Sequence, residues 1–407
     1  MPQVKPDVET FARIKVVGTG GSGVNAINHM ITSKVKGVDF IAINTDAQDL
    51  HHSPAKKKIH IGKNVTRGLG AGMNPEVGRK AVEETKEEVQ EALKGADMVF
   101  IASGLGGGTG SGASPVVART AREGGALTVA VVTKPFFFEG PQRMAIANKA
   151  LGELKKEVDA IIVIPNDKLI ELVDKDVPSE KAFEICDDIL KSAVEGISDL
   201  ITTPGIINID FADIKAIMTD TGSALMGIGI AGGEDRAIVA AKAAINSPLL
   251  DVSINGAKGV LFSIAGGSDL TLHEIKDAAQ IITESIDPEA RVIFGTIKDD
   301  NLNKGEIKVT LIATEFPNRG DLLPSEQGAH DQKKTVFAKK EASEEKAPEG
   351  KIFNTIDKKE RVQPKAEPKP MTSRPSTQNP DSNDDSEDPD DDEWSAVPAF
   401  LRRSKIK

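Results

Sequence analysis

The first half of the chain alternates between short, continuously apolar runs and longer segments with helical periodicity. Polar helix-like segments separate the apolar runs, for example PEVGRKAVEETKEEVQEALKGA at 75–96. Buried strands that alternate with helices predict a parallel sheet with helices on both faces. The predicted strands are RIKVVG, VDFIAIN, ADMVFIASG, ALTVAVVTKP and DAIIVIPN, at 13–18, 38–44, 96–104, 126–135 and 159–166.

A broad apolar stripe at helical spacing predicts one long helix over 179–202. The width of the stripe indicates that this helix is buried between two layers, and the proline and glycine of TTPG at 202–205 end it. Beyond it, a mixed pattern predicts a smaller α/β domain. Its predicted helices are 211–220, 234–246 and 272–286, and its predicted strands are 259–266, 290–297 and 306–315.

After residue 317 the regular pattern ends. Lys, Glu, Pro, Ser and Asn dominate up to the acidic run DDSEDPDDDE, so this segment is predicted to be a disordered linker. The last residues, EWSAVPAFLRRSKIK, contain the only tryptophan, Trp394, in an apolar cluster followed by basic residues. This composition favours a short docking peptide, and an ordinary disordered terminus is the alternative.

Composition narrows the classes of function. A chain of 407 residues has room for two domains, and its net charge of −11 argues against general affinity for nucleic acid or an anionic membrane. The single cysteine, Cys186, excludes internal disulfides and cysteine-based zinc sites. The sequence has neither a signal-peptide pattern nor an apolar run of about 20 residues. We therefore expect a soluble cytoplasmic protein without direct membrane insertion.

Two glycine-rich loops follow predicted strands. GTGGSG at 18–23 fits G-x-G-x-x-G, and Asp46 lies close to where a dinucleotide-binding protein places its ribose ligand, so an NAD(P)-binding oxidoreductase is one interpretation. GLGGGTGSG at 104–112 argues for another, since its six glycines can turn backbone N–H groups onto an anion at a helix N-terminus. A flexible loop without a ligand is the alternative there.

Two such loops on neighbouring strands favour a di- or triphosphate over a dinucleotide. The chain has no P-loop lysine motif and no protein-kinase signature. The phosphates are therefore expected to be held by backbone amides, Thr109 and a magnesium ion.

GGGTGSG at 106–112, together with GTGGSGVNAINHM at 18–30, resembles the tubulin/FtsZ family and, within it, the bacterial cell-division GTPases. The resemblance runs from residue 11 to about 316 and includes VPAFLRR at 397–403. It implies a tubulin-like α/β fold, in which a parallel-sheet nucleotide-binding domain is joined by a long central helix to a smaller α/β domain with a disordered tail. It also implies a GTPase that polymerises head to tail into the cytokinetic ring.

With this resemblance, the predicted organisation runs through six parts. They are an N-terminal tail (1–10), a GTP-binding domain (11–178), the central helix (179–204), a C-terminal GTPase-activating domain (205–317), the linker (318–390) and the docking peptide (391–407). The family also implies that residues 394–403 bind membrane-tethering and regulatory division proteins at mid-cell. No acidic residue immediately precedes Val397, which leaves that partner open.

The resemblance further implies the nucleotide contacts. They comprise the first glycine loop, a loop that senses the terminal phosphate, the second glycine loop, contacts beside the ribose and phosphates, and readers of the base. In chain order these residues are Gly21, Ser22, Gly23, Val24, Asn25, Asn44, Ala71, Gly72, Gly108, Thr109, Gly110, Thr133, Glu139, Arg143, Asn166, Phe183 and Asp187.

Three of these assignments have specific chemical consequences. Asp187 can accept both N–H groups on the Watson–Crick edge of guanine, and Phe183 would stack on the base. Without the resemblance, Phe183 is more simply a core residue and Asp187 a solvent-facing one. Ser22 adds a hydroxyl to the first loop, where we expect a shifted contact with binding retained.

The candidate catalytic residues lie in NIDFADI: Asn208, Asp210 and Asp213. Asp210 and Asp213 are three residues apart and share one face of a first helical turn, for which helix capping is the simpler interpretation. The resemblance implies instead that both carboxylates position the attacking water on the nucleotide of the next subunit and that Asn208 orients the loop. No metal ligands can be assigned from the sequence.

Overall fold

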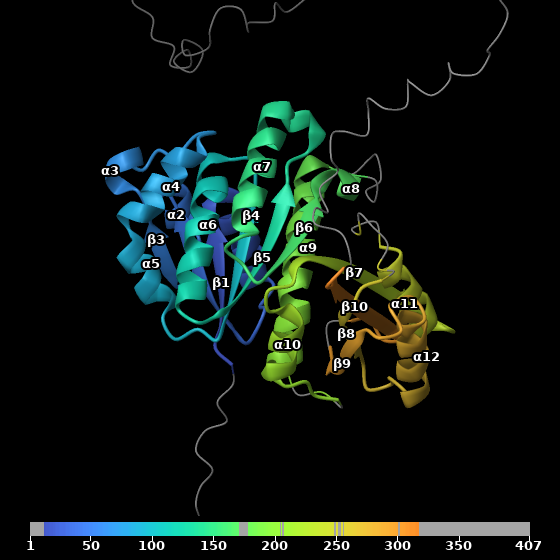
Figure 1. The fold of residues 1–407 in the computed structure, drawn as a ribbon. Helices are drawn as coiled ribbons and strands as arrows, with labels where there is room; N and C mark the ends of the chain where they lie inside the picture. Colours follow the sequence, from blue (N-terminus) through green and yellow to red (C-terminus); the bar gives the residue numbers. More distant parts are fainter. Residues whose placement is uncertain are drawn as a thin grey trace, which may run out of the picture. The chain divides into compact units, whose positions relative to one another are not determined.

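The computed structural model describes residues 12–316 except 171–177, 204, 206, 248–249, 251–253, 255 and 300–301. The predicted N-terminal tail, linker and docking peptide lie outside the described residues. The described part forms one ten-stranded sheet with the strand order β3-β2-β1-β4-β5-β6-β7-β10-β8-β9 (Figure 1). Its strands are β1 (Ile14–Thr19), β2 (Val38–Asn44), β3 (Lys57–His60), β4 (Met98–Gly104), β5 (Leu127–Lys134), β6 (Ala160–Pro165), β7 (Gly222–Gly232), β8 (Gly259–Gly266), β9 (Arg291–Lys298) and β10 (Glu306–Thr314).

The sheet changes character at β7. The six strands β3, β2, β1, β4, β5 and β6 are all parallel. β7 joins β6 in parallel over a short register that starts at Ala160↔Gly222. β7 and β8 then both pair antiparallel with β10, and β9 pairs parallel with β8. The two halves of the chain therefore share one continuous hydrogen-bonded sheet.

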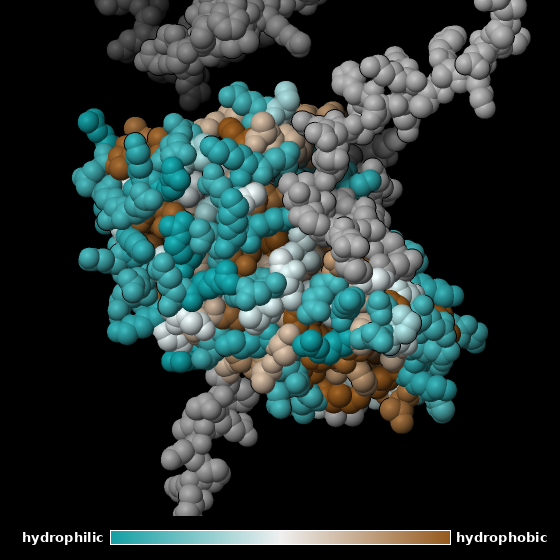
Figure 2. Space-filling view, in the orientation of Figure 1, coloured by the Kyte–Doolittle hydropathy of each residue, from teal (hydrophilic) through white to brown (hydrophobic). Residues whose placement is uncertain are grey.

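Helices cover both faces of the parallel half, because its strands are apolar on both sides. Along β1, Val16 packs into a core with α1 and α9, whereas Val17 packs into a second core with α4 to α7. In Figure 2 the visible outer surfaces of the helices are mostly hydrophilic, as expected for amphipathic helices on a sheet. The helices are α1 (Gly20–Thr32), α2 (Ala47–His52), α3 (Lys63–Thr66), α4 (Pro75–Glu84), α5 (Lys86–Leu93), α6 (Gly108–Glu123), α7 (Pro141–Leu154), α8 (Asn166–Ile170), α9 (Ser179–Thr202), α10 (Phe211–Met218), α11 (Arg236–Ile245) and α12 (Leu272–Thr283), with a short 3₁₀ turn η1 at Phe137–Glu139.

Helix α9 is the central helix that the apolar stripe predicts. Ala193, Val194 and Ile197 are fully buried in a core that also contains residues of β1, β4 and the second-half strands β8 and β10. At 1.5 Å per residue, its 24 residues extend for about 36 Å. The prediction of a long helix between two layers is confirmed, and α9 connects the two halves of the molecule (Figure 1).

Most of the predicted elements are present with small shifts at their ends, and three differences are clear. The segment 75–96 forms two helices, since α4 ends at Glu84 and α5 begins at Lys86. The strands β3 and β7 do not appear among the predicted strands.

Among the described residues, no helix is both long and apolar enough to cross a membrane.

Candidate nucleotide-binding site

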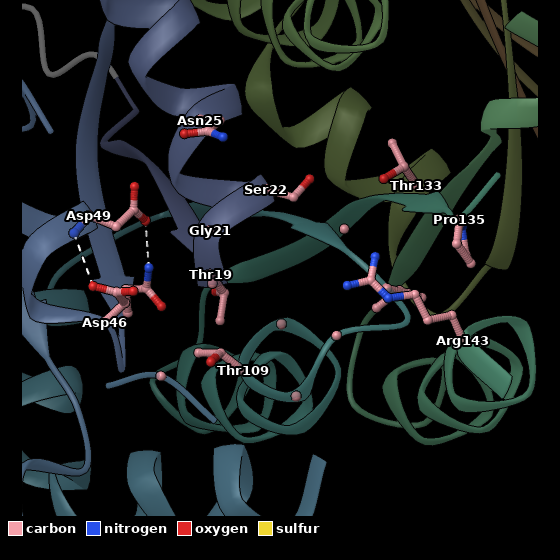
Figure 3. A pocket seen from close by; sticks show the side chains of 18 of the residues that line it. Thr19, Gly21, Ser22, Asn25, Asp46, Asp49, Thr109, Thr133, Pro135 and Arg143 are labelled. Atoms are coloured by element: carbon pink, nitrogen blue, oxygen red, sulfur yellow. Dashed lines mark hydrogen bonds between the residues drawn. The ribbon is translucent and has the colours of Figure 1, made fainter. Parts of the chain in front are cut away.

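A cavity of about 630 Å³ opens at the carboxyl ends of the parallel strands (Figure 3). Thr19, Asn44 and Gly104 line it from the ends of β1, β2 and β4, which is where open α/β sheets bind their ligands. Most of the predicted nucleotide contacts belong to its lining. They are Gly21, Ser22, Asn25, Asn44, Ala71, Gly72, Gly108, Thr109, Gly110, Thr133, Glu139, Arg143, Asn166, Phe183 and Asp187.

Two predicted contacts lie outside this lining. Val24 is fully buried in the core that α1 shares with the sheet. A Cβ atom on Gly23 would overlap the carbonyl oxygen of Ala102 on β4. Both residues therefore allow α1 to pack closely against the sheet, and they position the first glycine loop from behind.

Two helices begin at the cavity without caps of their own. α1 starts at Gly20 and α6 at Gly108, and neither has a side-chain cap hydrogen bond or an acidic residue in its first turn. By contrast, Asp46 caps α2 by accepting hydrogen bonds from the backbone N–H groups of Gln48 and Asp49. The first N–H groups of α1 and α6 are thus left for an external acceptor, and the helix dipoles favour an anion there.

The glycines of the two loops serve two different purposes. A Cβ on Gly20, which has a φ of +74°, would lie 2.8 Å from the backbone nitrogen of Gly110, so the two loops are in direct contact. Gly107 is different, because a Cβ there would meet no atom within 4 Å. Packing does not require a glycine at that position, and its absence of a side chain keeps the cavity open to a ligand.

A network of polar side chains forms the wall next to β2. The amide of Asn44 donates to a carboxylate oxygen of Asp49 at 2.6 Å, and Asn44 Oδ1 accepts from the N–H of Thr45 at 2.8 Å. The hydroxyl oxygens of Thr45 and Thr109 are 2.6 Å apart, which ties this wall to the second glycine loop. Burial raises the pKa of Asp49 above its usual value, although the hydrogen bond from Asn44 opposes the shift.

The opposite wall carries the ion pair between Arg143, in the first turn of α7, and Glu139, which lies four residues earlier in η1. Glu139 also accepts a hydrogen bond from the N–H of Phe136 at 2.9 Å, so its carboxylate is fixed. Arg143 points toward the middle of the cavity in Figure 3, opposite the start of α1. It is therefore placed as a cation across the cavity from the first glycine loop.

The three residues predicted to read the base, Asn166, Phe183 and Asp187, all line the cavity. The side chain of Phe183 is 52% exposed, so the simpler interpretation of Phe183 as a core residue is wrong. The Phe183 ring packs edge-on against Phe136, with centroids 5.5 Å apart. Asn166 is buried, and its Oδ1 has no hydrogen-bond partner within the described protein, which leaves an acceptor for a ligand.

Asp187 lines the cavity from α9, one turn after Phe183. Burial raises its pKa to about 6, and the neighbouring charges of Asp188 and Glu184 act in the same direction while His29 opposes them. The alternative interpretation of Asp187 as a solvent-facing residue is thus wrong, because its side chain is half-buried in the wall of the cavity. Burial likewise raises the pKa of its neighbour Cys186 to about 12, so that thiol stays protonated.

Several lining residues were not predicted. Gly104 and Gly107 belong to the glycine loop already singled out, so the density of glycine was a usable signal. Asp46 and Asp49 lie in the polar stretch NTDAQD after β2, which was a weaker one. The lining residues without a prediction are Thr19, Gly20, Asp46, Asp49, Gly70, Gly104, Leu105, Gly107, Pro135, Cys186 and Leu190.

The candidate catalytic residues lie elsewhere in the chain. Asp210 is the residue before α10 and Asp213 is in its first turn, and neither lines the cavity. Asp210 occupies the N-cap position, but its side chain makes no capping hydrogen bond. From Asp187 to the end of α9 at Thr202 the helix rises by about 22 Å, so the cavity and these carboxylates are at opposite ends of α9.

Asn208 has a local partner at this second position. Its Oδ1 accepts a hydrogen bond from the N–H of Gly205 at 2.7 Å, which closes a turn between α9 and α10. Within the part of the chain that the structure describes, no group of three or more His, Cys, Asp or Glu side chains is arranged to hold a metal ion.

Two regions of the chain match known families. Residues 13–174 match the GTPase domain of the tubulin/FtsZ family, and residues 222–317 match the C-terminal domain of the FtsZ family. These regions contain the cavity and the second-half sheet, respectively, apart from the cavity-lining residues of α9.

Solved structures give the same result. A dimer of FtsZ from M. jannaschii is 48% identical, with a TM-score of 0.72, over 75% of this chain and 89% of that one. A mutant of M. jannaschii FtsZ is also 48% identical, with a TM-score of 0.73, over 76% and 93%. CetZ2 from Haloferax volcanii, solved as a GTPγS-bound protofilament, shares the fold at 20% identity and a TM-score of 0.64, over 74% and 92%.

These matches do not favour the oxidoreductase interpretation of the first glycine loop, and they do not test the bacterial assignment. They agree with the tubulin-like α/β fold and with a cavity built to take a polyphosphate. The chain belongs to the FtsZ branch of the tubulin/FtsZ family and is a GTPase of the cytoskeletal type.

Proposed function

We propose that this GTPase assembles head to tail into filaments and hydrolyses GTP at a site that two adjacent subunits complete. The observation that carries the proposal is the separation, within one molecule, of the cavity from Asp210 and Asp213. A helix of this length keeps the carboxylates away from a nucleotide bound in the same chain. They can reach a nucleotide only when the α10 end of one copy meets the cavity of another.

Contact between unlike ends of identical subunits is heterologous, and it produces an open filament when the rotation does not close. Self-association has support from a relative, since M. jannaschii FtsZ, which is 48% identical, was solved as a dimer. By the same family argument, the filaments organise a cytokinetic ring at mid-cell. Residues 394–403 would then bind membrane-tethering and regulatory division proteins.

In the proposed site, the uncapped starts of α1 and α6 hold the phosphates, and Asp187, Asn166 and Phe183 recognise guanine. Asp210 and Asp213 from the next subunit position the attacking water. Catalysis of this kind works by orientation and electrostatic stabilisation, without a covalent intermediate.

A magnesium ion fits the donor set of this cavity. Asp46 and Asp49 both line it, and magnesium in nucleotide sites is bound by one or two carboxylates together with the phosphates. When bound, the ion offsets negative charge on the phosphates. Asp46 and Asp49 are the residues that would hold it from this chain, and Asp210 and Asp213 could then approach the phosphates with less repulsion.

The test is GTP turnover per molecule measured against protein concentration, with light scattering recorded in parallel. A shared site predicts negligible turnover below a threshold concentration and a steep rise that coincides with scattering. Turnover per molecule that is constant from the lowest concentration, without scattering, would show that each monomer is a complete enzyme. The roles of Asp210 and Asp213 in the neighbouring subunit would then be wrong.

A further inference from the structure

His29 links α1, the helix that follows the first glycine loop, to α9, the helix that carries Phe183 and Asp187. It lies on α1, nine residues after the uncapped start of that helix, and its Nε2 is 2.9 Å from a carboxylate oxygen of Asp188 on α9. The imidazole is 27% exposed, and Lys191 approaches the same carboxylate at 3.8 Å from within α9. α1 and α9 also pack directly against each other.

This contact determines how α9 is rotated. Asp187 and Asp188 are successive residues, so their side chains leave the helix about 100° apart. A partner on α1 that holds Asp188 outside the cavity therefore directs Asp187 into it. Phe183 lies one turn earlier than Asp187 and lines the same cavity, so its orientation depends on the same rotation.

The contact also affects the charge of Asp187. To accept two N–H groups from guanine, this carboxylate has to be ionised, yet burial and the charges of Asp188 and Glu184 favour its protonated form. His29 is the neighbour that acts in the opposite direction. A second cation in this cluster, Lys191 on α9, is paired with Asp188.

We propose that His29 is a positioning residue for guanine: its contact with Asp188 fixes the rotation of α9, so that Asp187 and Phe183 face the cavity, and so strengthens recognition of the base. The proposal rests on the proposed role of Asp187 as the guanine reader. His29 itself does not line the cavity, so it acts through α9 and makes no contact with the nucleotide.

The experiment measures the equilibrium affinity of the full chain for GTP between pH 6 and pH 8, below the polymerisation threshold. We compare the wild type with His29→Ala at each pH, so that titration of the nucleotide itself cancels. Because the unprotonated Asp187 is scarcest at low pH, the loss in His29→Ala should grow on acidification. We expect it to reach about fivefold at pH 6 and to be less than about 1.5-fold at pH 8.

His29→Gln separates the two parts of the role. Glutamine can still donate to Asp188 but carries no charge, so we expect it to keep the affinity at pH 8 and to lose affinity at pH 6. A loss in both variants that is equal at every pH would indicate packing alone and overturn the proposal, as would unchanged affinity. Thermal unfolding of each variant verifies that it is folded.

Asp187→Ala distinguishes this proposal from the one on which it rests. Its affinities for GTP and for ITP, which lacks the exocyclic amine of guanine, should become similar. If Asp187→Ala keeps the full preference for GTP, the base-reading role of Asp187 is wrong. If that preference disappears in Asp187→Ala while His29→Ala behaves as the wild type, only the role of His29 is wrong.

Discussion

The two ends of α9 are built for opposite purposes. At its N-terminal end, Phe183 and Asp187 face a cavity into which two uncapped helix starts direct their N–H groups. Beyond its C-terminal end, the chain turns into α10, where Asp210 precedes the helix and Asp213 lies in its first turn, and neither carboxylate lines the cavity. One end attracts an anion and the other supplies acidic groups. In the proposed function, each end is half of a site that two subunits complete.

The largest expected effect comes from removing the acidic half. Asp213→Ala should retain GTP binding, because Asp213 does not line the cavity, and should lose hydrolysis by at least about 100-fold. We would measure GTP affinity by equilibrium binding and turnover by phosphate release, at concentrations above the polymerisation threshold.

Mixing two inactive variants then tests whether the halves belong to different molecules. Gly107→Asp should block the cavity of one variant and leave its α10 end intact. At a GTP concentration that saturates the wild type but not Gly107→Asp, a mixture with Asp213→Ala places an intact acidic end against an intact cavity, so turnover should exceed that of either variant alone. A mixture that stays inactive while the two variants still coassemble would contradict the shared site.

The next effect, on binding, separates the glycines that serve the ligand from those that serve packing. Gly107→Asp adds a carboxylate to open space, so it should leave the melting temperature unchanged and weaken GTP binding by about 100-fold. Gly110→Ala would place its Cβ 2.6 Å from the hydroxyl of Ser103 and 2.7 Å from the carbonyl of Gly104. It should lower the free energy of unfolding by about 1–3 kcal/mol.

Gly107→Ala is the matched control for this pair. It adds one methyl group at a backbone conformation, φ −89° and ψ 177°, that any residue adopts, so the fold should tolerate it. Equal destabilisation by alanine at 107 and at 110 would show that both positions of the second glycine loop require glycine for packing alone.

The sequence predicts the parallel half of the fold well, because its strands are continuously apolar and its loops are rich in glycine. It fails at β7, whose sequence GSALMGIGIAG contains four glycines and so has low strand propensity. The structure explains two of them, since Cβ atoms on Gly227 and Gly229 would overlap backbone atoms of α11. A strand that packs this closely beneath a helix cannot be distinguished from a loop by local propensity.

The residues of the site likewise divide into those that the sequence predicts and those that it does not. Glycine density and strand–loop junctions locate the two glycine loops of the cavity, and the family resemblance adds Phe183 and Asp187 of α9 to its lining. The sequence alone does not distinguish a cavity contact from a close-packing residue, as Gly23 and Val24 show. Nor does spacing reveal the distance between Asp187 and Asp213, which is set by the length and burial of α9.

The smallest expected effect concerns Ser22, the hydroxyl inside the first glycine loop. Its Oγ lies 2.5 Å from the position that a Cβ on Gly104 would occupy, so α1 and β4 approach closely at this point. Ser22→Gly removes this side chain without disturbing the uncapped start of α1, and GTP affinity should change by no more than about twofold.

Gly104→Ala should be destabilising when Ser22 is present, by about 1–3 kcal/mol, because the new methyl group overlaps its side chain. In the Ser22→Gly background the nearest remaining atom is the hydroxyl of Thr133 at 3.5 Å, an ordinary contact. The double variant should therefore recover most of the lost stability, as a double-mutant cycle of thermal unfolding would measure. Additive losses would mean that Gly104 is needed for the backbone itself. Coupling would show that the anion-binding end of the molecule depends on the fit between α1 and β4.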